Sequence, residues 1–224
     1  MGHRMNDRTQ DRVFAACGIA FVALQLIGFT LGGSAHQLTI SSSATEISQA
    51  LAKPVDSLSW AGAYLNLLSV GAFLGFAGWT CSKLGGGLLG QVARLAGGCY
   101  ASLTVASLAV MDSISYLAGR GLDVQLARTL ITVNEALFVT TWFLFAFFLL
   151  AAGLMGLRAA RPALGWSALA IALSSLSAAI SVQQLGQFSV LLWFGWVVAA
   201  SFSLGRAKPA STRRFAAAAA AQGA

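Results

Sequence analysis

Six apolar stretches, each about as long as a helix that crosses a bilayer, constrain this chain more than any other feature. A membrane-spanning helix needs about 20 predominantly apolar residues. Such stretches lie near residues 13–33, 59–81, 94–118, 127–157, 163–182 and 187–205. Inside the hydrocarbon every backbone N–H and C=O must be paired within the protein, which only helices and closed barrels achieve. The sequence therefore predicts an all-α fold, a bundle of six transmembrane helices.

The overall composition agrees with an integral membrane protein. Of the 224 residues, 57% are hydrophobic and 9% are charged, whereas a soluble domain carries roughly 25% charged residues. The boundary between the fifth and sixth stretches depends on a short polar segment that contains Gln183, Gln184 and Gln187. Without this boundary one apolar stretch of more than about 40 residues would be too long for a single span.

The positions of the basic residues predict the orientation, because cytoplasmic loops retain Lys and Arg. With six spans, only Lys53, Arg120 and Arg128 lie on one side of the membrane. The other side carries Arg4, Arg8, Arg12, Lys83, Arg94, Arg158, Arg161, Arg206, Lys208, Arg213 and Arg214. Both termini are therefore expected in the cytoplasm. This topology and an attraction to anionic headgroups of the lipid bilayer explain the net charge of +7 without a nucleic-acid partner.

A single folded domain is expected, the helix bundle at 13–206. It lies between a basic cytoplasmic N-terminus at 1–12 and a disordered, basic and Ala-rich cytoplasmic tail at 207–224. The first apolar stretch has about 20 residues, longer than the roughly 7 to 15 of a signal peptide. We therefore expect it to be retained as a helix.

The largest segment outside the spans, residues 34–58, carries the signals of a short helix. Ser43 and Glu46 have the spacing of a capping box, and a proline follows the helical run. Ile47 and Leu51 fall on one face at helical spacing. The sequence predicts an amphipathic helix on the external side. We expect its apolar face to lie in the membrane interface rather than to lid a cavity between the helices.

Two carboxylates lie inside the apolar stretches, Asp112 in the third and Glu135 in the fourth. A charge in the hydrocarbon costs a few kcal/mol or more unless it is paired, hydrated or neutralised, so an intramembrane acid is a candidate functional residue. The third and fourth spans form a predicted antiparallel hairpin, and the two acids are equally far from its expected centre at position 123.5. We therefore expect the acids at similar depth, in the outer third of the membrane.

Polar side chains of other spans are expected at the same level. Gln25 shares a helix face with Gly28, and Asn66 shares one with Gly62. Polar residues on such small-residue faces point into a bundle. The predicted polar layer contains Gln25, Asn66, Asp112, Asn134 and Glu135, with Tyr64 and Tyr116 as further contributors.

Two interpretations of this layer remain open. In one, it binds a proton, a cation or a small polar ligand from the external side, with one proton shared between the two acids. In the other, neutral acids form interhelical hydrogen bonds with Asn and Gln side chains. A third possibility, a membrane-embedded enzyme acting on lipid-like substrates, is less favoured, because the sequence contains no H-E-x-x-H, G-x-S-x-G or Walker A motif. The only histidines, His3 and His36, lie outside the spans, so no metal or other cofactor is expected.

Small residues recur at four-residue spacing, as in Gly28 and Gly32 on the first span and Gly71 and Gly75 on the second. This spacing lets helix backbones approach closely and predicts a tight bundle. The same small-residue faces suggest an alternative function. In it the protein is a non-catalytic accessory subunit that stabilises a membrane complex as a homo-oligomer or hetero-oligomer.

Three short segments carry a family resemblance. They are Thr45-Glu46-Ile47, then Gly62-Ala63-Tyr64-Leu65-Asn66-Leu67-Leu68, then Ala96-Gly97-Gly98 at the start of the third span. This order resembles uncharacterised bacterial six-helix membrane proteins of a domain-of-unknown-function family. The resemblance implies a multi-pass protein of the bacterial inner (plasma) membrane, and it supplies no catalytic residues.

Overall fold

A computed structural model describes residues 7–32, 38–53, 55–181 and 184–206. The predicted tail at 207–224 and His36 lie outside these residues. In the described ranges all regular structure is helical, which confirms the all-α prediction. The helices are α1 (Asp7–Leu31), α2 (Ala44–Leu51), α3 (Ser57–Leu84), α4 (Gly87–Leu117), α5 (Val124–Arg158), α6 (Pro162–Ser181) and α7 (Gln184–Gly205).

Four of these helices, α1, α3, α4 and α5, are long and apolar enough to cross a membrane. The apolar parts of α6 and α7 are shorter, Pro162–Ser177 and Ser189–Gly205. The chain is thus a helix bundle of the kind found in membrane proteins. The prediction of six spans is finer than this observation and is taken up below as a proposal.

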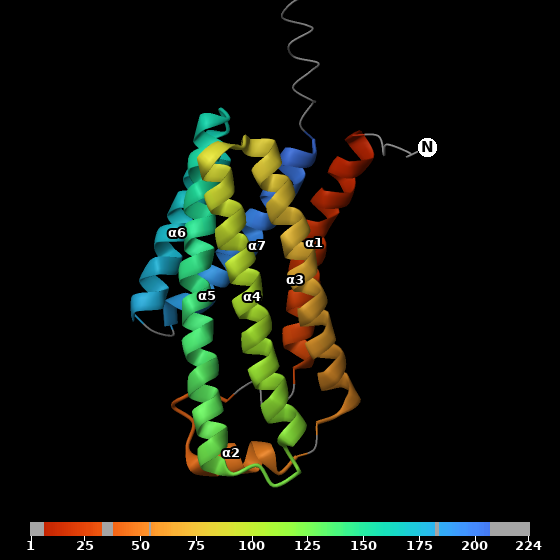
Figure 1. Cartoon of the computed structure of the whole chain (residues 1–224), viewed down its shortest axis with the longest axis vertical. Coiled ribbons are helices and arrows are strands. Elements are labelled where there is room, and N and C mark those ends of the chain that lie inside the picture. The colour runs from red at the N-terminus through yellow and green to blue at the C-terminus, as the bar shows by residue number, and fades with distance from the viewer. Residues whose placement is uncertain (1–6, 33–37, 54, 182–183, 207–224) are drawn as a thin grey trace, which may run out of the picture.

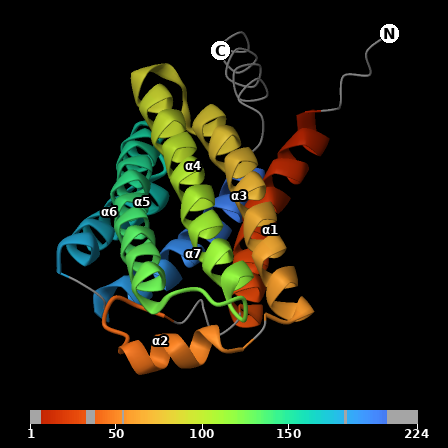
Figure 2. The ribbon, with the colours of Figure 1, turned by 60° about the horizontal axis from the view of Figure 1, so that its bottom comes forward.

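The long helices run up and down the bundle, and α2 lies across one end (Figure 1). The end at which α1 starts and α7 ends is called the terminal end here, and the end that carries α2 is called the cap end. Figure 2 shows α2 crossing beneath the ends of α4 and α5. Both helices contact α2.

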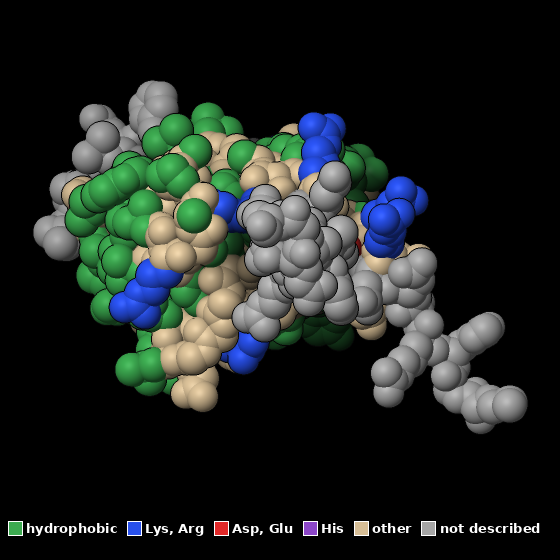
Figure 3. Space-filling model, turned by 90° about the horizontal axis from the view of Figure 1, so that it is seen from above, with side chains coloured by type: hydrophobic (Ala, Val, Ile, Leu, Met, Phe, Trp, Pro, Cys, Tyr) green, Lys and Arg blue, Asp and Glu red, His purple; other side chains and the backbone are tan. Residues whose placement is uncertain are grey.

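Basic residues gather at the terminal end, where Figure 3 shows Lys and Arg side chains around the face. This follows from chain order, because each of them lies at the start or end of a helix that reaches this end. The described ones are Arg8, Arg12, Lys83, Arg94, Arg158, Arg161 and Arg206. Lys53, Arg120 and Arg128 belong to the cap end.

Helix lengths make the two ends of the bundle different. The 35 residues of α5 extend about 52 Å, whereas the 20 residues of α6 extend about 30 Å. Since α5 ends and α6 starts at a shared turn at the terminal end, α4 and α5 continue past the α6–α7 hairpin toward the cap end (Figure 1). At the cap end, α4 and α5 therefore pack against α2 rather than against α6 and α7.

An aromatic cluster fills the centre of the bundle around Trp193 of α7. Its ring lies 4.0 Å from that of Phe145, and 5.1 to 6.2 Å from Phe21, Tyr100 and Phe73. Edge-to-face contacts of this kind add to the free energy of apolar burial. The indole Nε1 of Trp193 is buried, with no hydrogen-bond partner among the described residues.

Glycines set the closest helix crossings. A Cβ added to Gly28 of α1 would come within 2.9 Å of the Gly62 carbonyl oxygen of α3, and the reverse distance is also 2.9 Å. Gly153 of α5 and Gly165 of α6 form a similar crossing. The predicted close approach is confirmed at Gly28, where the two backbones leave no space for a side chain.

The pair on the second span, Gly71 and Gly75, does not share one packing face. Gly75 contacts α1, with Cys17 Sγ 3.4 Å from a Cβ built at the glycine. Gly71 is exposed, and nothing lies within 4 Å of its Cβ position. Of these two glycines, Gly75 therefore faces α1, whereas Gly71 lies on the outer surface of α3.

We predict opposite effects of adding a methyl group at Gly28 and at Gly71. Gly28→Ala should destabilise the bundle by about 1–3 kcal/mol, because the α1–α3 crossing cannot widen without losing packing. Gly71→Ala should be neutral or stabilise by about 0.5–1 kcal/mol, because alanine favours the helix and meets no neighbour. Thermal unfolding of both variants in detergent measures the difference, and equal melting temperatures would contradict the crossing.

Candidate functional site

The cap end begins with the capping box predicted for α2. Ser43 Oγ accepts the Glu46 backbone N–H at 3.2 Å, and Glu46 Oε2 accepts the Ser43 N–H at 2.6 Å. The predicted short helix is therefore confirmed, with Ser43 as its N-cap. The reciprocal bonds satisfy N–H groups at the helix start that have no partner within the helix.

The apolar face of α2 packs on protein. Ile47 and Leu51 are 1% and 6% exposed and form a cluster with Met111 and Ile114 of α4 and with residues of α5. The N–H of Gly119, in the α4–α5 turn, donates to the Leu51 carbonyl oxygen at 2.7 Å. The expectation that this face lies in the membrane interface is wrong, because α4 and α5 are long enough to bury it.

The register of the α4–α5 hairpin decides the relative depth of the two acids. Ser107 Oγ donates to Asn134 Oδ1 at 2.6 Å, and Ile114 packs in one cluster with Ala127. The Ser107–Asn134 pair and the turn between Leu117 and Val124 are both centred between residues 120 and 121, not at 123.5. A hairpin with this centre offsets Glu135 from Asp112 by six residues, about 9 Å along the axis.

The sequence predicted that the two acids lie at similar depth. This prediction is wrong. The reason is that α5 starts earlier than its apolar stretch. Asp123 caps the helix by accepting the N–H groups of Gln125 and Leu126 at 2.9 and 3.1 Å. The residues between this cap and the predicted apolar stretch are therefore already helical. The α4–α5 turn is shorter than predicted, and its centre lies nearer to α4.

Asp112 is half-buried near the cap end of α4, five residues before the last helical residue, Leu117. Its Oδ1 is shielded from solvent. The neighbouring Met111 and Ser115 are buried, at 6% and 5% exposure. Asp112 is thus a carboxylate with one oxygen inside the protein, beside the cluster that α2 covers.

Glu135 contacts the segment that leads into α2. Its Oε1 accepts the backbone N–H of Ile40 at 2.9 Å, across 95 residues of sequence. Two turns nearer the cap end, Arg128 Nη2 donates to the Ser42 carbonyl oxygen at 3.4 Å. The segment 40–42 therefore follows α5 toward the cap end. The sequence contains no local pattern that predicts this contact between the segment and α5.

Gln25 and Asn66 meet at the α1–α3 crossing through a third residue, Ser69. The Ser69 hydroxyl lies 2.5 Å from Gln25 Oε1 and 2.6 Å from the Asn66 carbonyl oxygen. The Asn66 side chain, 2% exposed, occupies the space that a Cβ on Gly28 would take. Ser69 follows Asn66 by three residues and so shares its helix face. This spacing could have placed Ser69 in the predicted polar layer.

The predicted layer therefore separates into distinct contacts. The Gln25–Ser69 hydrogen bond joins α1 to α3, with Asn66 packed beside it, whereas Asn134 joins α5 to α4. Tyr116 faces outward with 55% exposure, and the Arg120 guanidinium lies 3.9 Å from its ring centroid. Tyr64 is 66% exposed. Neither tyrosine extends the buried contacts, and the Tyr116–Arg120 pair is a cation–π contact.

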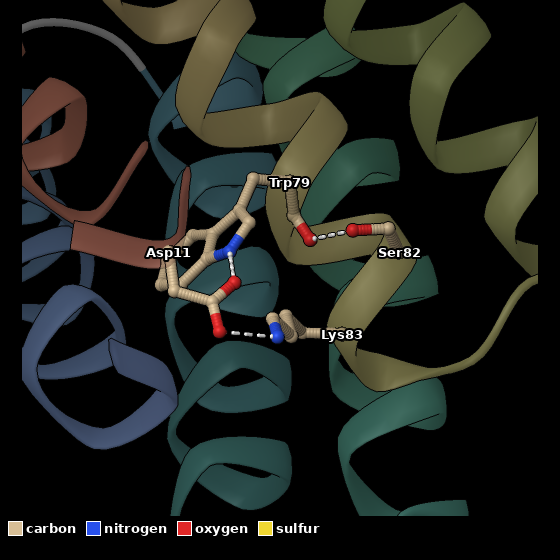
Figure 4. A network of polar contacts seen from close by, with 4 residues as sticks. All are labelled: Asp11, Trp79, Ser82 and Lys83. Carbon is tan, nitrogen blue, oxygen red and sulfur yellow. Dashed lines mark hydrogen bonds and ion pairs between the residues drawn. The ribbon is translucent and has the colours of Figure 1, made fainter. Parts of the chain in front are cut away.

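A separate polar network lies at the terminal end (Figure 4). Asp11 accepts Trp79 Nε1–H at 3.1 Å and pairs with Lys83 Nζ at 2.7 Å, while Ser82 Oγ donates to the Trp79 carbonyl oxygen. The network ties the start of α1 to the end of α3. Lys83 is one of the basic residues from which the topology was predicted, and Asp11, an acid just before the first apolar stretch, was not among the predicted site residues.

The described residues contain no group of three or more His, Cys, Asp or Glu side chains that could hold a metal ion. Comparison of the chain with protein-family models, with curated proteins and with solved structures finds no match. The long apolar helices and the composition define the class, a helical membrane protein. Its function has to be inferred from the residues themselves.

The Gln25–Ser69 contact generates a testable prediction. Ser69→Ala leaves a buried acceptor without its donor and should destabilise the bundle by about 1–2 kcal/mol. In a double-mutant cycle with Gln25→Leu, the coupling energy should be about 0.5–1.5 kcal/mol. Ser102→Ala is the control, because this exposed hydroxyl bonds only within α4, to the Gly98 carbonyl. A coupling energy of zero would show that the contact does not join α1 to α3.

The capping box makes the stability of α2 depend on pH. The pKa of Glu46 lies below its ordinary value of 4.5, because the backbone N–H of Ser43 donates to the carboxylate. Folding therefore favours the ionised form. Its contribution is complete above the unfolded pKa and is lost as the pH falls through the lowered folded pKa.

Amide exchange of residues 44–51, corrected for intrinsic rates, should accordingly show lower protection at about pH 3 than at about pH 6. Glu46→Gln removes the titration and should flatten this difference. An equal loss of protection in the variant would assign the effect to another group.

Proposed function

We propose that this protein binds a proton, a cation or a small polar ligand from the external side of a bacterial plasma membrane, with Asp112 as the titratable contact. One observation carries the proposal. Asp112 is half-buried at the cap end, with one carboxylate oxygen shielded from solvent. A carboxylate in such a place is costly unless a proton, a cation or a hydrogen-bond donor compensates its charge.

The other members of the predicted layer are not needed in the proposed ligand site. Gln25, Asn66 and Asn134 take part in contacts between helices or lie against them. The hydrogen bonds of Gln25 and Asn134 explain why these two side chains are tolerated in the bundle without any ligand, whereas the buried Asn66 Oδ1 packs against Gly28. Among these residues Asp112 is the carboxylate with an oxygen shielded from solvent, so a change of its charge is the most direct test of ligand binding.

We further propose six spans with both termini in the cytoplasm. This orientation is supported by the excess of Lys and Arg at the terminal end (Figure 3). It places the cap end outside. The α6–α7 hairpin would then form the fifth and sixth spans, and the ends of α4 and α5 with α2 would reach beyond it. The bacterial inner membrane as the location follows from the sequence resemblance.

A second function, that of an accessory subunit, is favoured by one observation. Gly71 and Gly78 on α3 and Gly98 on α4 have nothing within 4 Å of their Cβ positions. Small residues on an outward face allow another helix to approach closely. Co-purification of a stoichiometric partner that is lost on Gly71→Leu would support this alternative.

Asp112→Asn tests the binding proposal, because the change keeps the shape and removes the charge. Purified protein in detergent should show a rise in melting temperature with at least one cation from a panel of Na⁺, K⁺, Mg²⁺ and Ca²⁺, or on acidification. Asp112→Asn should weaken the apparent affinity about tenfold or more. Asp56→Asn is the matched control, since this exposed acid at the cap end is an N-cap that asparagine replaces well. A full response in Asp112→Asn would refute the proposal.

A further inference from the structure

We infer that Glu135 is a positioning residue: it latches residues 38–51, the cap, over the cap end of α4, while Asp112 contacts the ligand. This rests on the proposed function and assigns different roles to the two acids. It also predicts that ligand access to Asp112 requires the cap to open.

The cap is attached differently at its two ends. At the α2 end, Ile47 and Leu51 are almost fully buried, and Gly119 N–H donates to the Leu51 carbonyl oxygen at 2.7 Å. At the other end, two hydrogen bonds to α5 side chains hold residues 40–42, and Leu38 packs at the edge of the cluster. Local opening begins where few buried contacts must be broken. The cap should therefore open from the Ile40 end.

Glu135 makes the stronger of these two hydrogen bonds. Its Oε1 lies 2.9 Å from the Ile40 nitrogen, whereas Arg128 Nη2 lies 3.4 Å from the Ser42 oxygen. A hydrogen bond to a carboxylate is roughly twice as strong as one between neutral groups. Loss of the Glu135 acceptor should thus shift the cap toward its open form more than loss of the arginine.

The register of the hairpin separates Glu135 from the level of Asp112. The offset of six residues corresponds to about 9 Å along the helix axis. One oxygen of Glu135 is already bonded to the Ile40 backbone. A ligand of a few atoms held at Asp112 would not reach Glu135. The cap, in contrast, is held by the Glu135–Ile40 hydrogen bond.

The cap covers the face of α4 formed by Met111 and Ile114, which are close neighbours of Asp112 in the sequence. Ile47 and Leu51 pack against Met111 and Ile114, which lie on either side of Asp112 in the sequence. An eight-residue helix such as α2 is too short to be stable alone in water. When its anchors are released, it should lose order and expose this part of α4.

Thiol labelling tests the latch without any ligand. Ser115 is 5% exposed and follows Asp112 by three residues, so Ser115→Cys reports access to this part of α4. The reporter is made in a chain with Cys17→Ala, Cys81→Ala and Cys99→Ala and is labelled with a membrane-impermeant maleimide. Glu135→Ala removes the acceptor and should raise the labelling rate about tenfold or more.

Two matched variants separate the latch from a general loss of packing. Glu135→Gln keeps a carbonyl acceptor for the Ile40 N–H and should label within about threefold of the parent. Thr132→Ala, one turn away, removes a hydroxyl that bonds only within α5 and should label like the parent. Amide exchange of residues 38–51 in the chain with its native cysteines should follow the same order.

The outcomes are decisive for the latch. If Glu135→Ala labels and exchanges like the parent, the latch is refuted. If Glu135→Gln behaves like Glu135→Ala, an acceptor for the Ile40 N–H is not sufficient to hold the cap, and the latch as a hydrogen bond is refuted. Should Glu135→Ala fail to fold, Ile40→Pro removes the donor instead, and the same acceleration is expected. Because no ligand is involved, these results are independent of whether Asp112→Asn changes cation binding.

Discussion

Close approach between helix backbones is the interaction on which this bundle depends. In a bilayer, lipid tails are as apolar as leucine, so apolar side chains alone give helices little reason to associate. Gly28 and Gly62 let α1 and α3 touch, and the same crossing brings Ser69 within hydrogen-bond distance of Gln25. Packing and polar pairing are thus one event, because side chains this short could not meet across a wider gap.

The inequality of helix lengths divides the molecule into two regions. In the first, α1, α3, α4 and α5 supply the rings that pack around Trp193 of α7. In the second, α4 and α5 extend beyond α6 and α7 and bury a smaller cluster with Ile47 and Leu51. The larger region supplies rigidity. The smaller region is closed by a short helix with few anchors, and local opening is concentrated in such places.

The two carboxylates of the central spans gain different meanings from this arrangement. Glu135 uses a carboxylate oxygen to hold the Ile40 backbone, which explains an acid at this position without a ligand. In the function proposed above, Asp112, whose Oδ1 is shielded from solvent, is the binding group, and the segment that Glu135 holds controls access to it. A single binding group behind a latch accounts for both acids more simply than a proton shared between them.

By itself, the sequence determined the membrane class, the all-α fold, the approximate helix positions and the capping box of α2, because these depend on local composition and spacing. Only the tertiary structure decided that Asp112 and Glu135 lie at different levels. The Asp123 cap sets where α5 begins. Contacts such as Ser107–Asn134, which join residues far apart in the chain, set the α4–α5 register. The site of α2 docking was likewise decided by tertiary structure, since an amphipathic face fits a protein cluster and a membrane interface equally well.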